Sequence, residues 1–169
     1  MKWVTRSFPH VDRTVCAWLI KRFIDPDAEF VFINWPEEEL KPEYGMPFDI
    51  KGVKYGHRDN KCSFEVMIEE FKISDPYVKK IAEIVHAADI KGEIDKVPEA
   101  RGIKALMSGL RLITKDDYGT LELGMKIWDA LYAYFRSLDI EKEYEDELAQ
   151  LSKTERLGFI KSLIDSKNP

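Results

Sequence analysis

The order of apolar and polar positions divides the chain into two parts with different periodicity. In the first 60 residues, short apolar runs rich in β-branched and aromatic side chains alternate with breaks, which is typical of strands joined by turns. The four runs are residues 2–6, 29–35, 48–50 and 53–55. The last two runs are separated only by Lys51-Gly52, which suggests a hairpin. Between the first two runs, the apolar positions predict a helix from Asp12 to about Ile24. We therefore expect three or four short strands in a small, mostly antiparallel sheet in the N-terminal third.

From Ser63 onward the apolar positions recur with the 3.6-residue period of a helix. Ser63 is a suitable N-cap residue, and Asp75 followed by Pro76 is a typical helix start. The predicted helices are residues 63–72, 76–90, 98–114 and 117–138. This pattern predicts an α+β fold, in which a larger helical part packs on the small sheet, with one domain over residues 1–138.

Residues 139–169 differ from the rest in composition. They are dense in Glu, Lys and Asp as far as Lys153, and Ser152 and Glu155 have the spacing of a capping box before a short amphipathic stretch. We expect a charged helix and a short amphipathic helix appended to the domain. This tail is expected to dock on the domain core, and it is also the candidate surface for a homo-oligomer.

Charge and cysteine content narrow the function classes. The net charge is -5 and the sequence pI about 5.3, which disfavours nucleic-acid binding because such domains usually carry a basic excess. No apolar run approaches the length of a membrane span. The two cysteines lack CxxC spacing, so we expect reduced thiols and a cytoplasmic protein. The phosphate-loop, dinucleotide, zincin and nucleophile-elbow motifs are absent from the sequence.

The segment 53–65, VKYGHRDNKCSFE, concentrates residues that can carry chemistry between a predicted strand and a predicted helix. Cys62 stands just before the helix, where the helix dipole would favour a thiolate. Glu65 falls in the first helical turn, from which it can point back toward His57. The alternative is an ordinary polar loop followed by a capped helix.

Two further positions are unusual for their helices. His86 and Asp89 lie on one side of the helix 76–90, and Glu83 completes a Glu-x-x-His spacing that helix-borne metal sites use. His86 lies roughly 140° from the centre of the apolar stripe, so a site there requires another element to cover it. Asp12 lies on the inner face of the first helix, either as its N-cap or as a ligand or base beside Cys16.

Arg13 and Arg58 indicate a different chemistry. Each stands at a helix start or in the loop before one, where backbone N–H groups already favour an anion. Two arginines could hold an oxyanion through bidentate contacts, or both could be ordinary surface residues.

Five segments carry a resemblance to a known family: KWVTR, VDRTVCAWLIKRFIDPDAEF, PFDIKGVKYGHRDNKCSFE, DPYVKKIAEIVHAAD and MKIWDALYAYFR. Together, in this order over residues 1–138, they resemble the C-terminal domain of the chromate-resistance ChrB family. The family pattern falls on Asp12, Arg13, Cys16, Gly56, His57, Cys62, Phe64, Glu65, His86, Asp89, Asp129 and Tyr132. ChrB proteins usually carry a further N-terminal region linked to regulation, whereas this chain begins at the domain. With the acidic pI, this predicts that the chain is not a DNA-binding regulator.

The leading hypothesis is a cytoplasmic metal-binding protein related to chromate resistance. Its ligands would be Asp12, His57, Glu65, His86 and Asp89. Such mixed nitrogen and oxygen donors suit a divalent transition metal, namely Zn, Mn or Fe, and sulfur from Cys16 or Cys62 would favour zinc. The first alternative is a module that binds a small oxyanion, chromate or sulfate, through Arg13 and Arg58. Further alternatives are a redox enzyme that uses the bound metal and a protein-interaction module that uses the tail.

Overall fold

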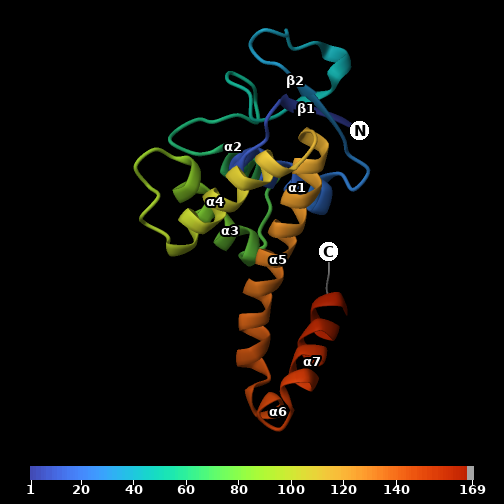
Figure 1. Ribbon diagram of the computed structural model, residues 1–169, viewed down its shortest axis with the longest axis vertical. Coiled ribbons are helices and arrows are strands. Elements are labelled where there is room, and N and C mark those ends of the chain that lie inside the picture. Colours follow the sequence, from blue (N-terminus) through green and yellow to red (C-terminus); the bar gives the residue numbers. More distant parts are fainter. Residues whose placement is uncertain (167–169) are drawn as a thin grey trace.

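The fold, seen in a computed structural model that describes residues 1–166, consists of a three-stranded sheet covered by helices (Figure 1). The sheet contains β1 (Lys2–Arg6), β2 (Glu29–Ile33) and the short β3 (Met46–Pro47), in the order β2-β1-β3. The expected α+β class is therefore confirmed. Within the described residues, no helix is long and apolar enough to cross a membrane.

The sheet is parallel, so the predicted antiparallel pairing was wrong. β1 pairs with β2 from Lys2↔Glu29 to Arg6↔Ile33, and with β3 at Trp3↔Met46. The physical reason is the helix between β1 and β2, which returns the chain to the end of the sheet where it began and so makes the next strand run in the same direction.

The predicted hairpin at residues 48–55 was also wrong. Only one isolated parallel bridge, Phe48↔Tyr55, joins the two runs. Asp49 takes a positive φ of 48°, which takes the chain out of the extended conformation, and its buried side chain accepts hydrogen bonds from Arg6 and Arg13. Polar contacts thus replace strand pairing in this segment.

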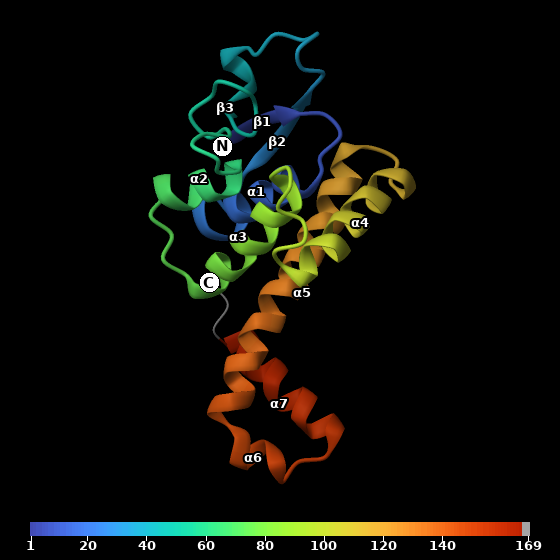
Figure 2. The ribbon, with the colours of Figure 1, turned by 90° about the vertical axis from the view of Figure 1, so that its left-hand side faces the viewer.

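The central helix α1 (Val11–Leu19) is buried along its whole length. It continues as the π-helical turn η1 (Ile20–Ile24), and it packs between the sheet and the helices α2 (Ser63–Glu70), α3 (Pro76–Asp89) and α5 (Asp117–Glu143) (Figure 2). Because α1 also carries Asp12, Arg13 and Thr14 into the interior, each of these polar side chains must find partners there.

The predicted helices are confirmed with shifts of a few residues at their ends. Asp75 caps α3 by accepting hydrogen bonds from the amides of Tyr77 and Val78. The helix α4 (Pro98–Ile113) packs on α3 and α5.

The C-terminal tail packs on α5. α5 extends beyond the helical part of the domain, and α6 (Glu145–Ala149) turns the chain so that α7 (Lys153–Ser166) runs back beside the lower half of α5 (Figures 1 and 2). The Arg136 guanidinium donates a hydrogen bond to the Ile164 carbonyl near the end of α7. The predicted tail of residues 139–169 ends in positions 167–169, which lie outside the described residues.

Close packing of α5 on α1 depends on Gly124, and this can be tested. A Cβ atom at Gly124 would lie 3.2 Å from the Thr14 Cβ, and Thr14 is held in place because Trp128 Nε1 donates to its hydroxyl at 3.0 Å. We expect Gly124→Val to lower the free energy of unfolding by about 1–3 kcal/mol, measured by urea denaturation.

The matched control is Gly109→Val in α4, where an added Cβ meets no atom within 4 Å. This variant should stay within about 0.5 kcal/mol of the parent, because valine has a somewhat higher helix propensity than glycine. Equal stability of the two variants would contradict the proposed tight contact between α5 and α1.

Candidate functional site

The Asp12 carboxylate caps a helix other than its own. The N-cap position of α1 is His10, which makes no side-chain cap hydrogen bond, so the prediction that Asp12 caps its own helix was wrong. Instead, the buried Asp12 accepts hydrogen bonds from the amides of Ser63 at 2.8 Å and Phe64 at 2.9 Å. These amides belong to the first turn of α2, where N–H groups have no partners within the helix.

The start of α2 holds a second carboxylate. Cys62 is its N-cap residue, and Ser63, the predicted N-cap, is the first residue of the helix. Glu65 accepts a hydrogen bond from the Cys62 amide at 2.9 Å, which completes a capping box. Three successive amides therefore bind carboxylates, and the positive end of the helix dipole stabilises both negative charges.

His57 lies over Asp12 and meets three carboxylates through one ring nitrogen. Its Nε2 is 2.9 Å from Asp12 Oδ2, 3.3 Å from Asp89 Oδ2 and 3.4 Å from Asp49 Oδ1. Hydrogen bonds to Asp12 and Asp49 raise the pKa of His57 to about 10. Without another cation, His57 therefore holds a proton at neutral pH, although a single N–H cannot satisfy three acceptors.

Asp49 belongs to this cluster and was missed by the sequence analysis. Its Oδ2 accepts from Arg13 Nε at 2.9 Å and from Arg6 at 3.2 Å, while its Oδ1 accepts from the Ser63 hydroxyl at 3.0 Å. The sequence offers no clear signal for it, because an acid between two apolar residues, as in PFDIKG, is also the ordinary alternation of a half-buried strand.

The side-chain charges of this cluster balance only when His57 carries its proton. Asp12, Asp49 and Asp89 contribute three negative charges, and Arg6 and Arg13 contribute two positive ones. Burial and then the neighbouring Asp12 raise the pKa of Asp89 to about 6, against the opposing effect of the charge of His57.

The donor atoms fit a metal ion in type and spacing. Asp12, His57 and Asp89 each offer one ligand atom, and these atoms all lie within 4.8 Å of one another. Metal–ligand distances of about 2.0–2.2 Å place neighbouring ligands of one ion roughly 3 Å apart. The separations of 2.9 and 3.3 Å from His57 Nε2 to the two aspartates match that value.

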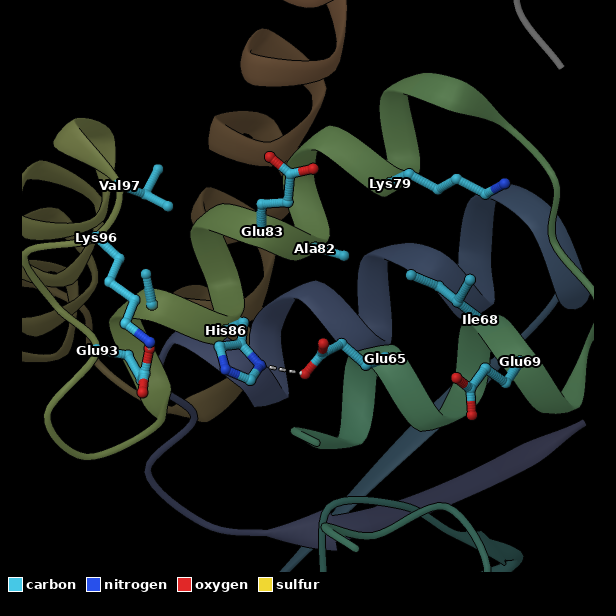
Figure 3. A pocket seen from close by; sticks show the side chains of 11 residues that line it. Glu65, Ile68, Glu69, Lys79, Ala82, Glu83, His86, Glu93, Lys96 and Val97 are labelled. Atoms are coloured by element: carbon cyan, nitrogen blue, oxygen red, sulfur yellow. Dashed lines mark hydrogen bonds and ion pairs between the residues drawn. The ribbon is translucent and has the colours of Figure 1, made fainter. Parts of the chain in front are cut away.

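The five predicted ligands fall into two groups. Glu65 and His86 form a separate pair, with His86 Nδ1 2.8 Å from Glu65 Oε2 (Figure 3). Glu65 thus turns to His86 and not to His57. A site at His86 requires another element to cover this side of α3, and α2 provides it through Glu65.

The two arginines predicted to bind an anion have separate partners. Arg13 is buried and donates to Asp49 and to the carbonyls of Ser7 and Phe8. Arg58 pairs with Glu70 on the surface. The structure does not bring the two guanidinium groups to one partner.

Both cysteines are buried and free, as expected for reduced thiols. Burial raises the pKa of both, so the expectation of a Cys62 thiolate was wrong. The N-terminus of α2 does not favour the thiolate, because Asp12 and Glu65 already bring negative charge there. The Cys16 thiol lies 3.7 Å from Asp12 Oδ1.

Asp129 and Tyr132 hold other parts of the fold together. Asp129 accepts hydrogen bonds from Trp18 Nε1 and Arg22, and the Tyr132 hydroxyl donates to Asp75, the cap of α3. Neither of them contacts the cluster around His57 in the part of the chain that the structure describes.

Two comparisons with known proteins, one with family models and one with curated proteins, point to the same family. The family model described as "ChrB, C-terminal domain" matches residues 3–135. Protein ChrB from Cupriavidus metallidurans is 35% identical over 138 residues, which cover 80% of this chain and 41% of that protein. The chain therefore spans less than half the length of this curated relative. No solved structure matches.

The protonated His57 predicts a specific pH dependence of stability in metal-free protein. Because the pKa rises from 6.5 to about 10 on folding, the stabilisation is complete below pH 6.5 and is lost as the pH approaches 10. The difference in unfolding free energy between the parent and His57→Ala, measured with urea and a chelator, should shrink over this range.

His10→Ala is the control for this experiment. Burial, followed by the charge of Arg111, lowers the pKa of His10, so both folded and unfolded states hold it neutral above about pH 7.5. The difference in unfolding free energy between this variant and the parent should not change between pH 7.5 and pH 10. If the difference in unfolding free energy between the parent and His57→Ala also stays constant with pH, the charged pairing with Asp12 is contradicted.

Proposed function

This chain belongs to the ChrB C-terminal domain family, and we propose that it binds a divalent transition metal, Zn, Mn or Fe, in a function related to chromate resistance. The ligands are Asp12, His57 and Asp89. The observation that carries the proposal is the convergence of their donor atoms within 4.8 Å, from three separate parts of the chain.

The ligands are supported by other residues. Asp12 is fixed by two amides of α2, and Asp49 is fixed beside His57 by Arg6, Arg13 and Ser63. Supporting contacts of this kind orient metal ligands and increase metal affinity. An ion would replace the proton of His57 as the counter-charge of the aspartates.

The donor set restricts the choice of metal. One imidazole nitrogen with carboxylate oxygens suits Zn, Mn or Fe better than a soft ion, which would require thiolate ligands. Cys16 lies next to Asp12, but its thiol has a raised pKa and stays neutral in the metal-free protein. A bound ion would supply Lewis acidity and, with iron or manganese, a redox-active centre.

Access to the site supports binding of a further ligand or substrate beside the metal. The His57 side chain is 42% exposed and that of Asp89 24%, whereas that of Asp12 is 3% exposed. The site thus has a buried side that fixes the ligands and an open side toward solvent. Structural metal sites are usually closed by protein ligands, while catalytic sites keep an open position.

Calorimetry with Zn²⁺ or Mn²⁺ between pH 5 and 8, where histidine commonly titrates, tests the proposal. Binding must displace the proton of His57, so between pH 7 and 8 affinity should fall by roughly tenfold for each unit of acidification, with one proton released per ion. Below about pH 6 the fall should be steeper, because Asp89 also holds a proton there. His57→Ala and Asp89→Asn should lose binding.

Arg58→Ala is the control, because Arg58 lies outside the cluster and pairs with Glu70. It should bind the metal like the parent. Sulfate titrations on the same variants test the oxyanion alternative, in which affinity holds or rises on acidification. The metal assignment would be overturned if His57→Ala still bound the metal. It would also be overturned if the protein bound sulfate and only Arg58→Ala lost this binding.

A further inference from the structure

A pocket of about 630 Å³ lies beside α2, and His57 is not among the residues that line it. It is formed by α2, α3 and the segment 90–97 (Figure 3). Its walls carry apolar side chains of Ile68, Ala82, Ala87 and Val97. This volume is within the usual range of small-molecule sites, which is about 300–1,000 Å³.

Two atoms in this pocket, His86 Nε2 and Glu65 Oε1, can accept hydrogen bonds from a ligand. His86 Nδ1 lies 2.8 Å from Glu65 Oε2, and a carboxylate oxygen requires a donor, so the neutral form of the His86 ring carries its proton on Nδ1. The other ring nitrogen, Nε2, then offers a lone pair. Glu65 Oε2 is also bonded to the Cys62 amide, whereas Glu65 Oε1 has no hydrogen bond among the described residues.

The charges around the pocket are mainly negative. Four glutamates and two lysines line it: Glu65, Glu69, Glu83, Glu93, Lys79 and Lys96. Lys96 is paired with Glu93 and Glu69 with Lys61, whereas Glu83 and Lys79 have no ion pair among residues 1–166. With Lys61 counted, the four glutamates still exceed the lysines by one. A ligand that enters therefore meets acceptors and a negative potential over an apolar surface.

We propose that this pocket binds a small organic cation that carries N–H donors, an amidinium or a primary ammonium, on an apolar body. The cationic group would donate to Glu65 Oε1 and His86 Nε2, and the apolar body would contact Ile68, Ala82 and Val97. A charge-assisted hydrogen bond to a carboxylate is stronger than a neutral one, and a surrounding apolar wall strengthens it further. The site shares no ligand with the cluster of Asp12, His57 and Asp89.

Three probes of similar shape and different charge test this proposal. Benzamidine carries an amidinium on a phenyl ring, benzamide is its neutral counterpart and benzoate its anionic one. We expect benzamidine to bind at least roughly tenfold more tightly than benzamide, because only the amidinium is attracted by the carboxylates, and benzoate to bind least. Calorimetry gives the affinities, and NMR of the Ile68 methyl groups and the His86 ring locates the ligand.

Ala82→Phe should fill the pocket and lower benzamidine affinity by roughly tenfold or more, since the phenyl ring of the probe loses its place. Ala130→Phe, the same substitution at an exposed position of α5, is the matched control and should leave the affinity unchanged. Glu65→Gln should lower the affinity for benzamidine and change the affinity for benzamide little. Urea denaturation of each variant separates loss of binding from loss of the fold.

His57→Ala separates this site from the proposed metal centre, because it should leave benzamidine binding intact. Any of three results would overturn the proposal. These are tight binding of benzoate, an Ile68 methyl signal that does not shift when benzamidine is added, and an unchanged affinity of Ala82→Phe for benzamidine. Displacement of benzamidine by Zn²⁺ in His57→Ala, with changes at His86, would show that Glu65 and His86 hold a metal ion instead.

Discussion

The structure depends on one interaction, the capping of α2 by the Asp12 carboxylate of α1. α1 is buried on every side, so its carboxylate cannot be solvated and must be neutralised by donors inside the protein. The free amides at the start of α2 supply these donors and the positive end of a helix dipole. This contact fixes the position of α2 relative to α1 and holds the loop with His57 over the carboxylate. Removing the carboxylate would leave two buried amides without partners and His57 without its main hydrogen bond.

The same helix start separates two histidine–carboxylate pairs. Asp12 binds the amides of Ser63 and Phe64 and meets His57, while Glu65 binds the Cys62 amide and meets His86. One carboxylate lies in a polar cluster with further aspartates and arginines, and the other lies in an apolar pocket. The two pairs therefore have different chemistry, although both use the same residue types. The first suits a metal ion, and the second suits a ligand with its own cationic group.

Local signals predicted the helices and the family but not the contacts between distant segments. Periodicity, the Asp75 cap and the segments that resemble ChrB domains are visible in the sequence, and the helices and the family agree with them. The direction of the sheet depends on how α1 crosses from β1 to β2, and strand propensity does not encode this. The role of Asp12 depends on amides 51 and 52 residues farther along the chain. Asp49 joins the cluster through Arg13 and Arg6, which lie 36 and 43 residues before it. The wheel of α3 indicated that His86 needed a cover, but only the packing of α2 shows that Glu65 provides it.

Anomalous diffraction from crystals of the protein soaked with Mn²⁺ shows directly whether the His57 cluster holds a metal ion. We expect one strong peak bonded to His57 Nε2 and to carboxylate oxygens of Asp12 and Asp89, at roughly 2.0–2.3 Å, with Asp12 still bound to the amides of α2. A peak between Glu65 and His86 without one at His57, or an unchanged His57–Asp12 hydrogen bond with no ion at millimolar Mn²⁺ and neutral pH, would contradict it.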